Sequence, residues 1–407
     1  MTGDSKTAVR GGFGLLYDIA SLGSALHQGI SGTAPFSTQS TVTSTPASPL
    51  TVVLPLFFPP GTAGRGLRGP DYRMQQPHLL QYNLTVERQL PLDMAATIAY
   101  GGSRGINLVQ VKEGNPTVPR ILPDGRQFWT GNEPRTNPFW NEMTLMTAGG
   151  NSWYNSLQFG VTKRLSNGLQ FQSSYTWSKL MDETQGQLPA DNNNSSPAYG
   201  VDPTHREADR GLASFDLAHN WRLNAIYRLP GLTSARTLGK VLNGWWMSGI
   251  LSIQSGYPFT VVLSSNRSRA RVNGGAANID RPDLVPDRSF DAMILGGPAR
   301  YYDPTAFRIP PIGFLGTAGR SILRAPGFAT LDFSLAKDTA FGFLGESGKL
   351  EFRAEFFNLL NRANFSLPNR TVYSARADVE APLANAGRIS ATASTSRQIQ
   401  FALKLTF

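Results

Sequence analysis

The chain has 407 residues and no cysteine; 16% of its residues are charged and its formal net charge is +10. The lack of cysteine excludes a disulfide scaffold, a thiolate zinc site and a cysteine nucleophile. The positive charge does not indicate nucleic-acid binding, because the arginines are scattered along the chain without a helix-turn-helix, zinc-finger or RNA-binding signature. We expect them to line a wet interior and the loops.

No segment of the sequence predicts a membrane helix. The longest strongly apolar run, residues 49–60, is broken by prolines and is far shorter than the ~20 residues that such a helix needs. A membrane protein with this sequence must therefore be a closed β-barrel, because only helices and barrels satisfy all backbone groups in lipid. Residues 1–12 carry no apolar signal-peptide core, so we expect a fragment, or a start downstream of the true one.

Alternation of polar and apolar residues, which is the period of a β-strand, recurs along the chain. It is clear in residues 169–178 and 217–228, complete in 349–356, where four charged and four apolar residues alternate, and present again in 399–407. Each stretch has about the ten residues that a tilted strand needs to cross a bilayer. In chain order we predict ten strands, near residues 8–17, 78–90, 93–112, 152–165, 169–180, 214–229, 243–262, 326–338, 349–361 and 396–407.

The connections between these strands are alternately short and long. The short ones are 91–92, 166–168, 230–242 and 339–348, and the long ones are 18–77, 113–151, 181–213, 263–325 and 362–395. Tight periplasmic turns at one rim and long external loops at the other are typical of outer-membrane barrels. We therefore predict an all-β fold, an antiparallel transmembrane β-barrel whose C-terminus is periplasmic.

The long connections are rich in Asn, Pro, Gly and Ser, as in residues 191–197, and we expect solvated loops rather than folded units. On the alternating strand near the C-terminus, Glu351, Arg353 and Glu355 are expected to face the lumen. Two interpretations are open for these three side chains. They could guide a substrate, or they could form an internal salt-bridge network that stiffens the wall, and we favour the network.

Three patterns could carry chemistry, and each also has a simpler structural interpretation. Residues 101–105 match G-x-S-x-G, but a nucleophile elbow needs a helix next, whereas a strand-like run follows here. The four histidines are not at zinc-site spacing. Residues 191–202 loosely resemble a calcium loop but lack its essential glycine and glutamate. We therefore expect no enzyme activity, no catalytic residue, no cofactor and no metal.

Local motifs resemble the TonB-dependent receptors of the Oar-like group, which carry a carboxypeptidase-regulatory-like domain. The matching stretches keep an order and spacing similar to that group over most of the chain, most strongly over 150–407. These stretches are residues 10–18, 175–182, 216–230, 244–259, 319–335, 353–361 and 397–407.

The resemblance implies a 22-stranded barrel with an N-terminal plug, of which residues 1–407 are a single C-terminal portion of about ten strands. The plug, its TonB box and the N-terminal strands are then absent, and the TonB complex is a partner only through that missing plug. The function implied is energy-coupled passage of a large, unknown solute across the outer membrane. The alternatives are a passive outer-membrane pore or surface-binding barrel, and a soluble or secreted β-sandwich binding protein.

The last strand carries a further expectation from the same resemblance. In outer-membrane proteins a terminal aromatic residue that closes an alternating strand is a signal for the barrel-assembly machinery. That role would be held by Phe401, Leu403, Leu405 and Phe407. The expected partners are therefore outer-membrane lipid, the assembly machinery and the solute, and no nucleic acid.

Overall fold

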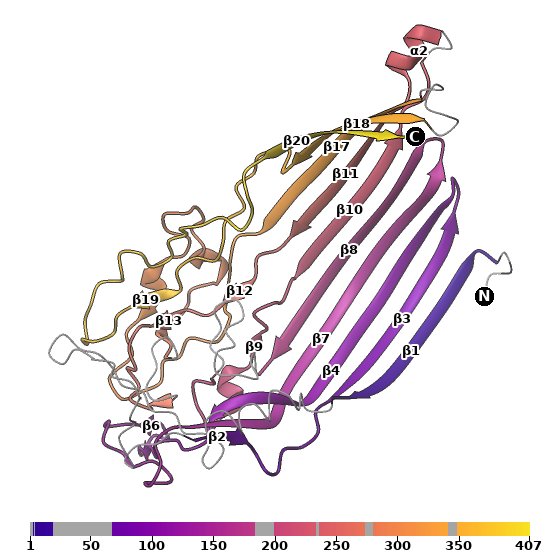
Figure 1. The fold of residues 1–407 in the computed structure, drawn as a ribbon. Helices are drawn as coiled ribbons and strands as arrows, with labels where there is room; N and C mark the ends of the chain where they lie inside the picture. The colour runs from indigo at the N-terminus through magenta and orange to yellow at the C-terminus, as the bar shows by residue number, and fades with distance from the viewer. Residues whose placement is uncertain are drawn as a thin grey trace, which may run out of the picture.

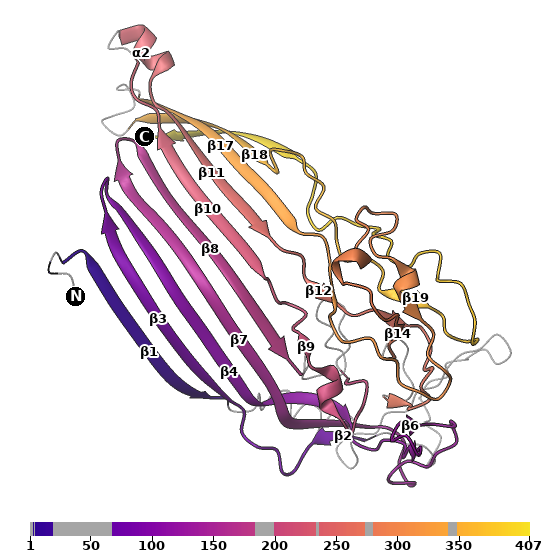
Figure 2. The same cartoon turned by 180° about the vertical axis from the view of Figure 1, so that it is seen from behind.

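The computed structural model describes residues 3, 5–18, 67–183, 199–232, 236–272, 280–340 and 348–407. These residues form one large curved sheet with irregular chain at one rim (Figures 1 and 2). Within the described ranges the main path of the sheet has ten strands, each antiparallel to its neighbours and following them in chain order. They are β1 (Thr7–Tyr17), β3 (His78–Leu90), β4 (Met94–Glu113), β7 (Met143–Ser166), β8 (Leu169–Asp182), β10 (His219–Arg228), β11 (Trp245–Gln254), β17 (Phe328–Ala340), β18 (Lys349–Phe357) and β20 (Gln398–Thr406).

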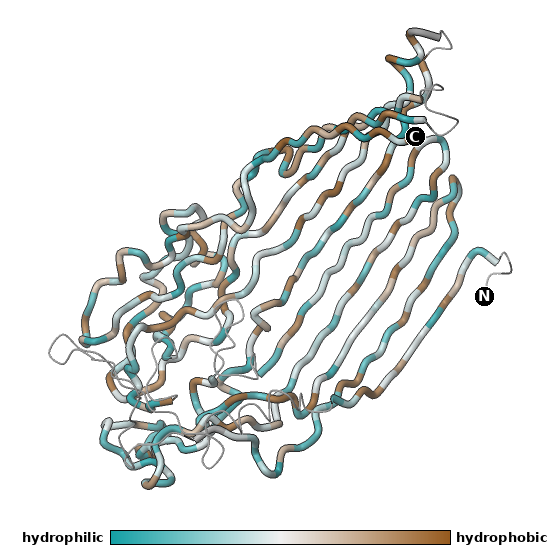
Figure 3. Tube along the Cα trace, viewed as in Figure 1, coloured by the Kyte–Doolittle hydropathy of each residue, from teal (hydrophilic) through white to brown (hydrophobic). Residues whose placement is uncertain are grey.

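The strand register separates the sheet into an apolar face and a polar face. One row of directly paired residues crosses eight strands and is apolar or aromatic throughout: Val9, Val86, Ile98, Phe159, Tyr175, Trp221, Ile253 and Ala329. The next row lies on the other face and is mostly polar or small: Ala8, Glu87, Thr97, Gly160, Ser174, Arg222, Ser252 and Thr330. Figure 3 shows the same alternation as changes of hydropathy along each strand. The alternation of polar and apolar residues in the sequence thus gives the sheet one continuous apolar face and one continuous, mostly polar face.

Within the described part of the chain, no second sheet covers the apolar face. Val9, Ile98 and Trp177 on this face are 60%, 51% and 57% exposed. A soluble sandwich would bury these side chains against each other, so the exposed face is the opposite of what that alternative predicts. Among the described residues no helix is both long and apolar enough to cross a membrane.

The sheet has two free edges within the described part of the chain. β1 pairs only with β3, and β20 pairs only with β18. The two edge strands lie at opposite sides of the curved sheet (Figure 1). The ten strands therefore form part of a barrel wall and do not close on themselves.

The two rims differ as expected from the connection lengths. At the short-turn rim, Asn167 and Gly168 join β7 to β8 with φ angles of 50° and 78°. Asn-Gly is the preferred pair for such a two-residue hairpin, because both residues tolerate positive φ. The connection predicted as a simple short turn at 230–242 instead contains a short helix, α2 (Arg236–Leu242), which projects beyond this rim (Figure 1).

The expectation of solvated loops rather than folded units is wrong for the described parts of the connections after β11 and β18. The main buried core of the described chain lies in the connections after β11 and β18, and includes Phe259, Met293, Tyr302, Phe307 and Val372. Water-excluded aromatic and aliphatic contacts of this kind stabilise a folded unit. We call this folded region at the long-loop rim the loop layer. The polar stretch 191–197, given as an example for that expectation, lies outside the described residues.

Short elements frame the loop layer. One strand, β2 (Leu67–Pro70), pairs in parallel with β7. Another, β9 (Gly211–Leu212), pairs antiparallel with the last two residues of β8. The remaining short elements are β5 (Arg120–Ile121), β6 (Gln127–Phe128), η2 (Arg206–Asp209), β12 (Pro258–Phe259), β13 (Val262–Leu263), β14 (Asp283–Leu284), η4 (Asp291–Met293), η5 (Pro304–Ala306), β15 (Phe307–Arg308), β16 (Leu323–Arg324) and β19 (Thr371–Tyr373).

Two predicted strand boundaries differ substantially from the structure. The strand predicted at 152–165 begins nine residues earlier, at Met143, because a register shift in β4 between Gly105 and Leu108 lets the pair β4–β7 continue beyond the region of simple alternation. The strand predicted at 243–262 ends at Gln254. There the chain passes so close to its neighbour that a Cβ atom on Gly256 would lie 1.6 Å from the carbonyl oxygen of Ala325. The residues that follow pair within the loop layer instead.

Candidate functional site: the polar face and the loop layer

The three charged residues singled out on β18 form a network along the polar face. Arg353 binds Glu351 through Nη2 at 2.5 Å and reaches Glu355 through Nη1 at 3.5 Å. Lys349 Nζ lies 2.9 Å from Asp338 Oδ2 on the adjacent strand and 3.8 Å from Glu351 Oε2. The ion pairs of the favoured interpretation are therefore present along this face. These charges largely compensate one another rather than presenting a single sign to a solute.

Other polar-face groups are also tied to neighbouring strands. Arg222 donates to Gln254 across the pair β10–β11 at 2.5 Å. Ser156 donates to the carbonyl oxygen of Gly101 at 3.0 Å and accepts from Gln158 at 3.1 Å. Cross-strand polar contacts of this kind add to the rigidity of a sheet. These contacts tie polar side chains into the hydrophilic face of the sheet.

Three arginines connect two separate parts of the loop layer. They lie in the connection between β11 and β17, and each pairs with an aspartate at the end of β8 or in the connection that follows it. The pairs are Arg281–Asp209, Arg320–Asp182 and Arg324–Asp216. Arg320 also donates to the carbonyl oxygens of Asp209 and Gly211. Because the first two pairs are almost fully buried, both partners must be in place to avoid an uncompensated charge.

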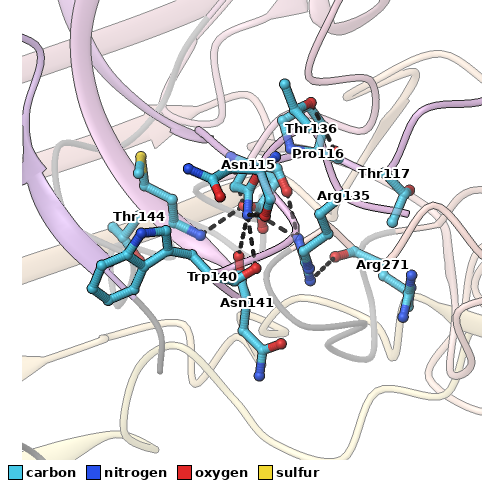
Figure 4. Close-up of polar contacts among 12 residues, drawn as sticks. Asn115, Pro116, Thr117, Arg135, Thr136, Trp140, Asn141, Thr144 and Arg271 are labelled. Atoms are coloured by element: carbon cyan, nitrogen blue, oxygen red, sulfur yellow. Dashed lines mark hydrogen bonds and ion pairs between the residues drawn. The ribbon is translucent and has the colours of Figure 1, made fainter. Parts of the chain in front are cut away.

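A second polar centre closes the connection between β4 and β7 at its base (Figure 4). The side-chain amide of Asn115 donates to the carbonyl oxygens of Asn137, Trp140 and Asn141 at 2.8–3.0 Å. Its Oδ1 accepts from the backbone N–H of Asn137 at 2.7 Å. Arg135 donates to the carbonyl oxygen of Asn115 at 2.7 Å. The buried side-chain amide of Asn115 thus holds together the beginning and the end of this connection.

Carboxylates of the loop layer have displaced pKa values. Burial alone would raise the pKa of Glu133, but hydrogen bonds from the Thr130 hydroxyl and from the backbone N–H groups of Thr130 and Gly131 outweigh it and hold that pKa at about 2. In Asp280, burial is the larger effect. It raises the pKa to about 6 although Ser268 donates two hydrogen bonds to the carboxylate. The surroundings of Glu133 therefore favour its charged form, whereas those of Asp280 favour its protonated form.

A polar cavity of about 330 Å³ lies where the end of β4 meets the segment around η2. Three of its four acidic side chains are engaged with other protein groups. Glu183 pairs with Arg206 at 3.3 Å, Asp202 accepts from Thr204, and Asp209 pairs with Arg281. Among the described residues no group of three or more potential metal ligands comes together. The cavity can hold a small hydrophilic group.

The terminal strand presents its apolar residues on the sheet's apolar face. Phe401, Leu403 and Leu405 lie opposite Ala354, Phe352 and Leu350 of β18. The rings of Phe352 and Phe401 stack with centroids 6.3 Å apart. Exposed fractions of 68%, 72% and 52% leave these three side chains available on the outside of the sheet, and Phe407, just past β20, is 84% exposed.

The G-x-S-x-G match is not a nucleophile elbow. Residues 101–105 lie inside β4, and Ser103 pairs with Gln81 and Tyr154 of the flanking strands. Of the histidines, His219 stacks on Tyr175 and shares a 2.8 Å hydrogen bond with its hydroxyl. His27 and most of the calcium-like stretch lie outside the described residues.

Sequence reasoning missed the loop core, the buried arginine–aspartate pairs and the centre at Asn115. A partial signal exists in the apolar cluster at residues 258–263, most of which was predicted as the end of the strand 243–262 and which instead packs into the loop core. The partners in the ion pairs are more than 70 positions apart along the chain, so no local pattern could join them.

An antiparallel sheet with one apolar and one polar face, tight turns at one rim and long loops at the other, is the wall of an outer-membrane barrel. The chain belongs to the outer-membrane β-barrel domain family, whose model matches residues 1–400. Its place is therefore the outer membrane, where the apolar face meets lipid. No curated protein matches the sequence.

Several solved structures resemble the chain at low identity. The outer-membrane transporter YddB of Escherichia coli is 9% identical with a TM-score of 0.47, covering 99% of this chain and 39% of its own. FpvA of Pseudomonas aeruginosa, solved bound to pyoverdines, is 9% identical with a TM-score of 0.40, covering 98% and 31%. The ferric-catecholate import receptor Fiu of E. coli K12 is 10% identical with a TM-score of 0.38, covering 98% and 32%. The chain spans less than two fifths of the length of each.

Proposed function

We propose that this chain is part of the wall of a TonB-dependent outer-membrane transporter, which moves a large solute across the membrane with energy from the inner membrane. The observation that carries the proposal is the open ten-strand sheet, with its apolar and polar faces and with a folded loop layer at one rim. Unpaired sheet edges are costly in lipid, because no water replaces the missing hydrogen bonds. Further strands must therefore pair with β1 and β20.

The proposed complete barrel has 22 strands, of which residues 1–407 supply about ten from the C-terminal part. Barrels of that size have a lumen wide enough to hold a plug, whereas smaller barrels are filled or form open channels. The largely compensated charges of the polar face suit a wall that holds a plug or lets a solute pass without trapping it. In the sequence, the motifs similar to Oar-like receptors support this class.

The proposed orientation places the loop layer outside the cell and the short-turn rim in the periplasm. The buried ion pairs and the aromatic core make the loop layer a preformed surface. A rigid binding surface loses less conformational entropy on binding than flexible loops do. In this proposal the loop layer makes the first contact with the solute, and coupling to TonB takes place through a plug.

The alternative is a passive pore or surface-binding barrel with the same wall. The largely neutral polar face fits a passive pore as well as it fits a coupled transporter. Energy dependence separates the two, because a passive pore needs no inner-membrane partner.

The test compares three strains of the native host: wild type, a deletion of the gene for this protein, and a deletion of the gene for TonB. Uptake is measured for a panel of labelled solutes above ~600 Da, including metal chelates, cobalamins, oligosaccharides and peptides. The proposal expects at least one solute whose uptake is lost in both deletion strains and restored by the returned gene. Loss only in the strain without this protein would favour the passive pore, and no affected solute would contradict transport.

A further inference from the structure

Trp153 on β7 lies beneath two guanidinium groups that come from different parts of the chain. Arg104 of β4 has its Cζ 3.9 Å from the centroid of the indole ring, and Arg210, just before β9, has its Cζ 4.4 Å from it. Cation–π contacts at these distances hold both cations close together although they repel each other. The arrangement brings two positive charges to one aromatic platform.

This platform lies on the apolar face at its long-loop end. Arg104 and Trp153 are direct partners in the register, and two residues nearer the bilayer Gly102, Asn155 and Lys179 form the next row on the same face. Below them, the row of Leu157 and Trp177 begins the exposed apolar surface, four residues and roughly 13 Å along the strand from Trp153. The cations therefore lie where the apolar surface ends, which is the level expected for lipid headgroups.

Among the described residues, no carboxylate forms an ion pair with Arg104, Arg210 or Lys179, although Glu183 attracts Arg104 electrostatically. Arg104 donates to neutral acceptors, the carbonyl oxygen of Ser152 at 3.2 Å and Asn151 Oδ1 at 3.1 Å. Glu183, which is near Arg104, is bound by Arg206 and by the side-chain amide of Asn151. Arg210 and Lys179 are exposed. Two guanidinium groups thus lie over the indole ring, and the exposed Lys179 lies one row nearer the bilayer on the same face.

We propose that Arg104 and Arg210 over Trp153, together with Lys179 in the next row of the same face, bind the phosphate groups of a lipid headgroup at the membrane surface. Guanidinium groups bind phosphate oxygens through paired hydrogen bonds. Indole rings favour the interface between hydrocarbon and water, and basic clusters there attract anionic lipid. The cluster lies on the face opposite the lumen, so a solute crossing the barrel would not meet it.

The experiment uses the protein purified from the outer membrane in mild detergent. Binding of bisphosphorylated lipid A and of the same lipid without phosphate is measured by native mass spectrometry and by titration. The test variants are Arg210→Gln, Lys179→Gln and the double variant R104Q/R210Q. The matched control is Arg300→Gln, which removes an exposed arginine of the loop layer.

The proposal expects a threefold to tenfold loss of affinity for the phosphorylated lipid in Arg210→Gln and at least tenfold in the double variant. The control should bind like wild type, and the lipid without phosphate should bind all variants equally. Because Arg210→Gln removes only a ring contact at an exposed side chain, it remains informative if the double variant fails to fold. Unchanged affinity in Arg210→Gln, an equal loss in Arg300→Gln, or equally tight binding of inorganic phosphate alone would overturn the proposal.

Discussion

At the scale of single residues, the loop layer depends on charges that are buried in pairs. Arg320 lies between Asp182 and three backbone carbonyl groups and is 4% exposed. Removing a single partner from a buried pair leaves the other charge without compensation. Replacing both partners by apolar groups avoids that cost. The contribution of the pair is therefore best measured as a coupling energy.

We predict that Arg320→Met destabilises the loop layer by about 3–5 kcal/mol, and that adding Asp182→Leu recovers part of this loss. Near-UV circular dichroism during urea unfolding in detergent measures the change. The control is Arg126→Met, because the pair Arg126–Asp124 is exposed and should cost less than about 1 kcal/mol. If Arg320→Met cost no more than the control, the pair would not stabilise the layer.

The buried carboxyl group of Asp280 predicts a pH dependence of stability. Burial raises its pKa to about 6 in the folded protein. The folded state therefore favours the protonated form. The stabilisation is fully present below the ordinary pKa of 3.8 and is lost as the pH rises through about 6.

Between pH 7 and pH 5, wild type should gain about 1 kcal/mol of stability relative to Asp280→Asn, which cannot be protonated in this range. Thermal unfolding of both proteins at the two pH values measures this difference. Glu133, with a pKa of about 2, does not disturb the comparison because its effect appears only below about pH 4.5. An identical gap in melting temperature at pH 5 and pH 7 would contradict the assignment to Asp280.

At the scale of elements, strands could be predicted where alternation is local and uninterrupted. Residues 349–356 alternate without a break and residues 169–178 do so except at Ser173, and β18 and β8 cover them. The first nine residues of β7 do not alternate, and they pair only because β4 shifts register. The loop core joins Phe259, Tyr302 and Val372 from distant segments without a common period, so no local pattern could predict it.

The final strand allows a prediction about assembly. We expect Phe401→Ser and Leu403→Ser to lower the outer-membrane level of the protein several-fold, because both changes remove apolar side chains from the face that meets lipid and from the proposed assembly signal. Gln400→Ser and Ala402→Ser change the polar face of the same strand and serve as matched controls. Immunoblots of outer-membrane fractions give the result. If substitutions on both faces lowered the outer-membrane level equally, the apolar face of β20 would not be the surface recognised during assembly.

At the scale of the whole molecule, the register of the ten strands aligns their alternating polar and apolar residues, so that the sheet has the two faces of a membrane-barrel wall. The apolar row from Val9 to Ala329 and the polar row beside it run across most of the sheet. The loop layer folds at one rim, and the network around Arg353 lies on the polar face. Membership of the outer-membrane β-barrel family places this wall in lipid.

The two faces of this wall must meet different solvents, and the absence of cysteine makes the difference directly measurable. Single cysteines at residues 171–176 and 221–226 carry spin labels, and their accessibility to oxygen and to a water-soluble nickel chelate is measured in the native outer membrane. We predict a period of two, with oxygen favoured at Phe171, Tyr175 and Leu223 and the nickel complex favoured at Gln172 and Asn224. Uniform accessibility to the nickel complex, or the opposite phase, would contradict the assignment of the apolar face to lipid.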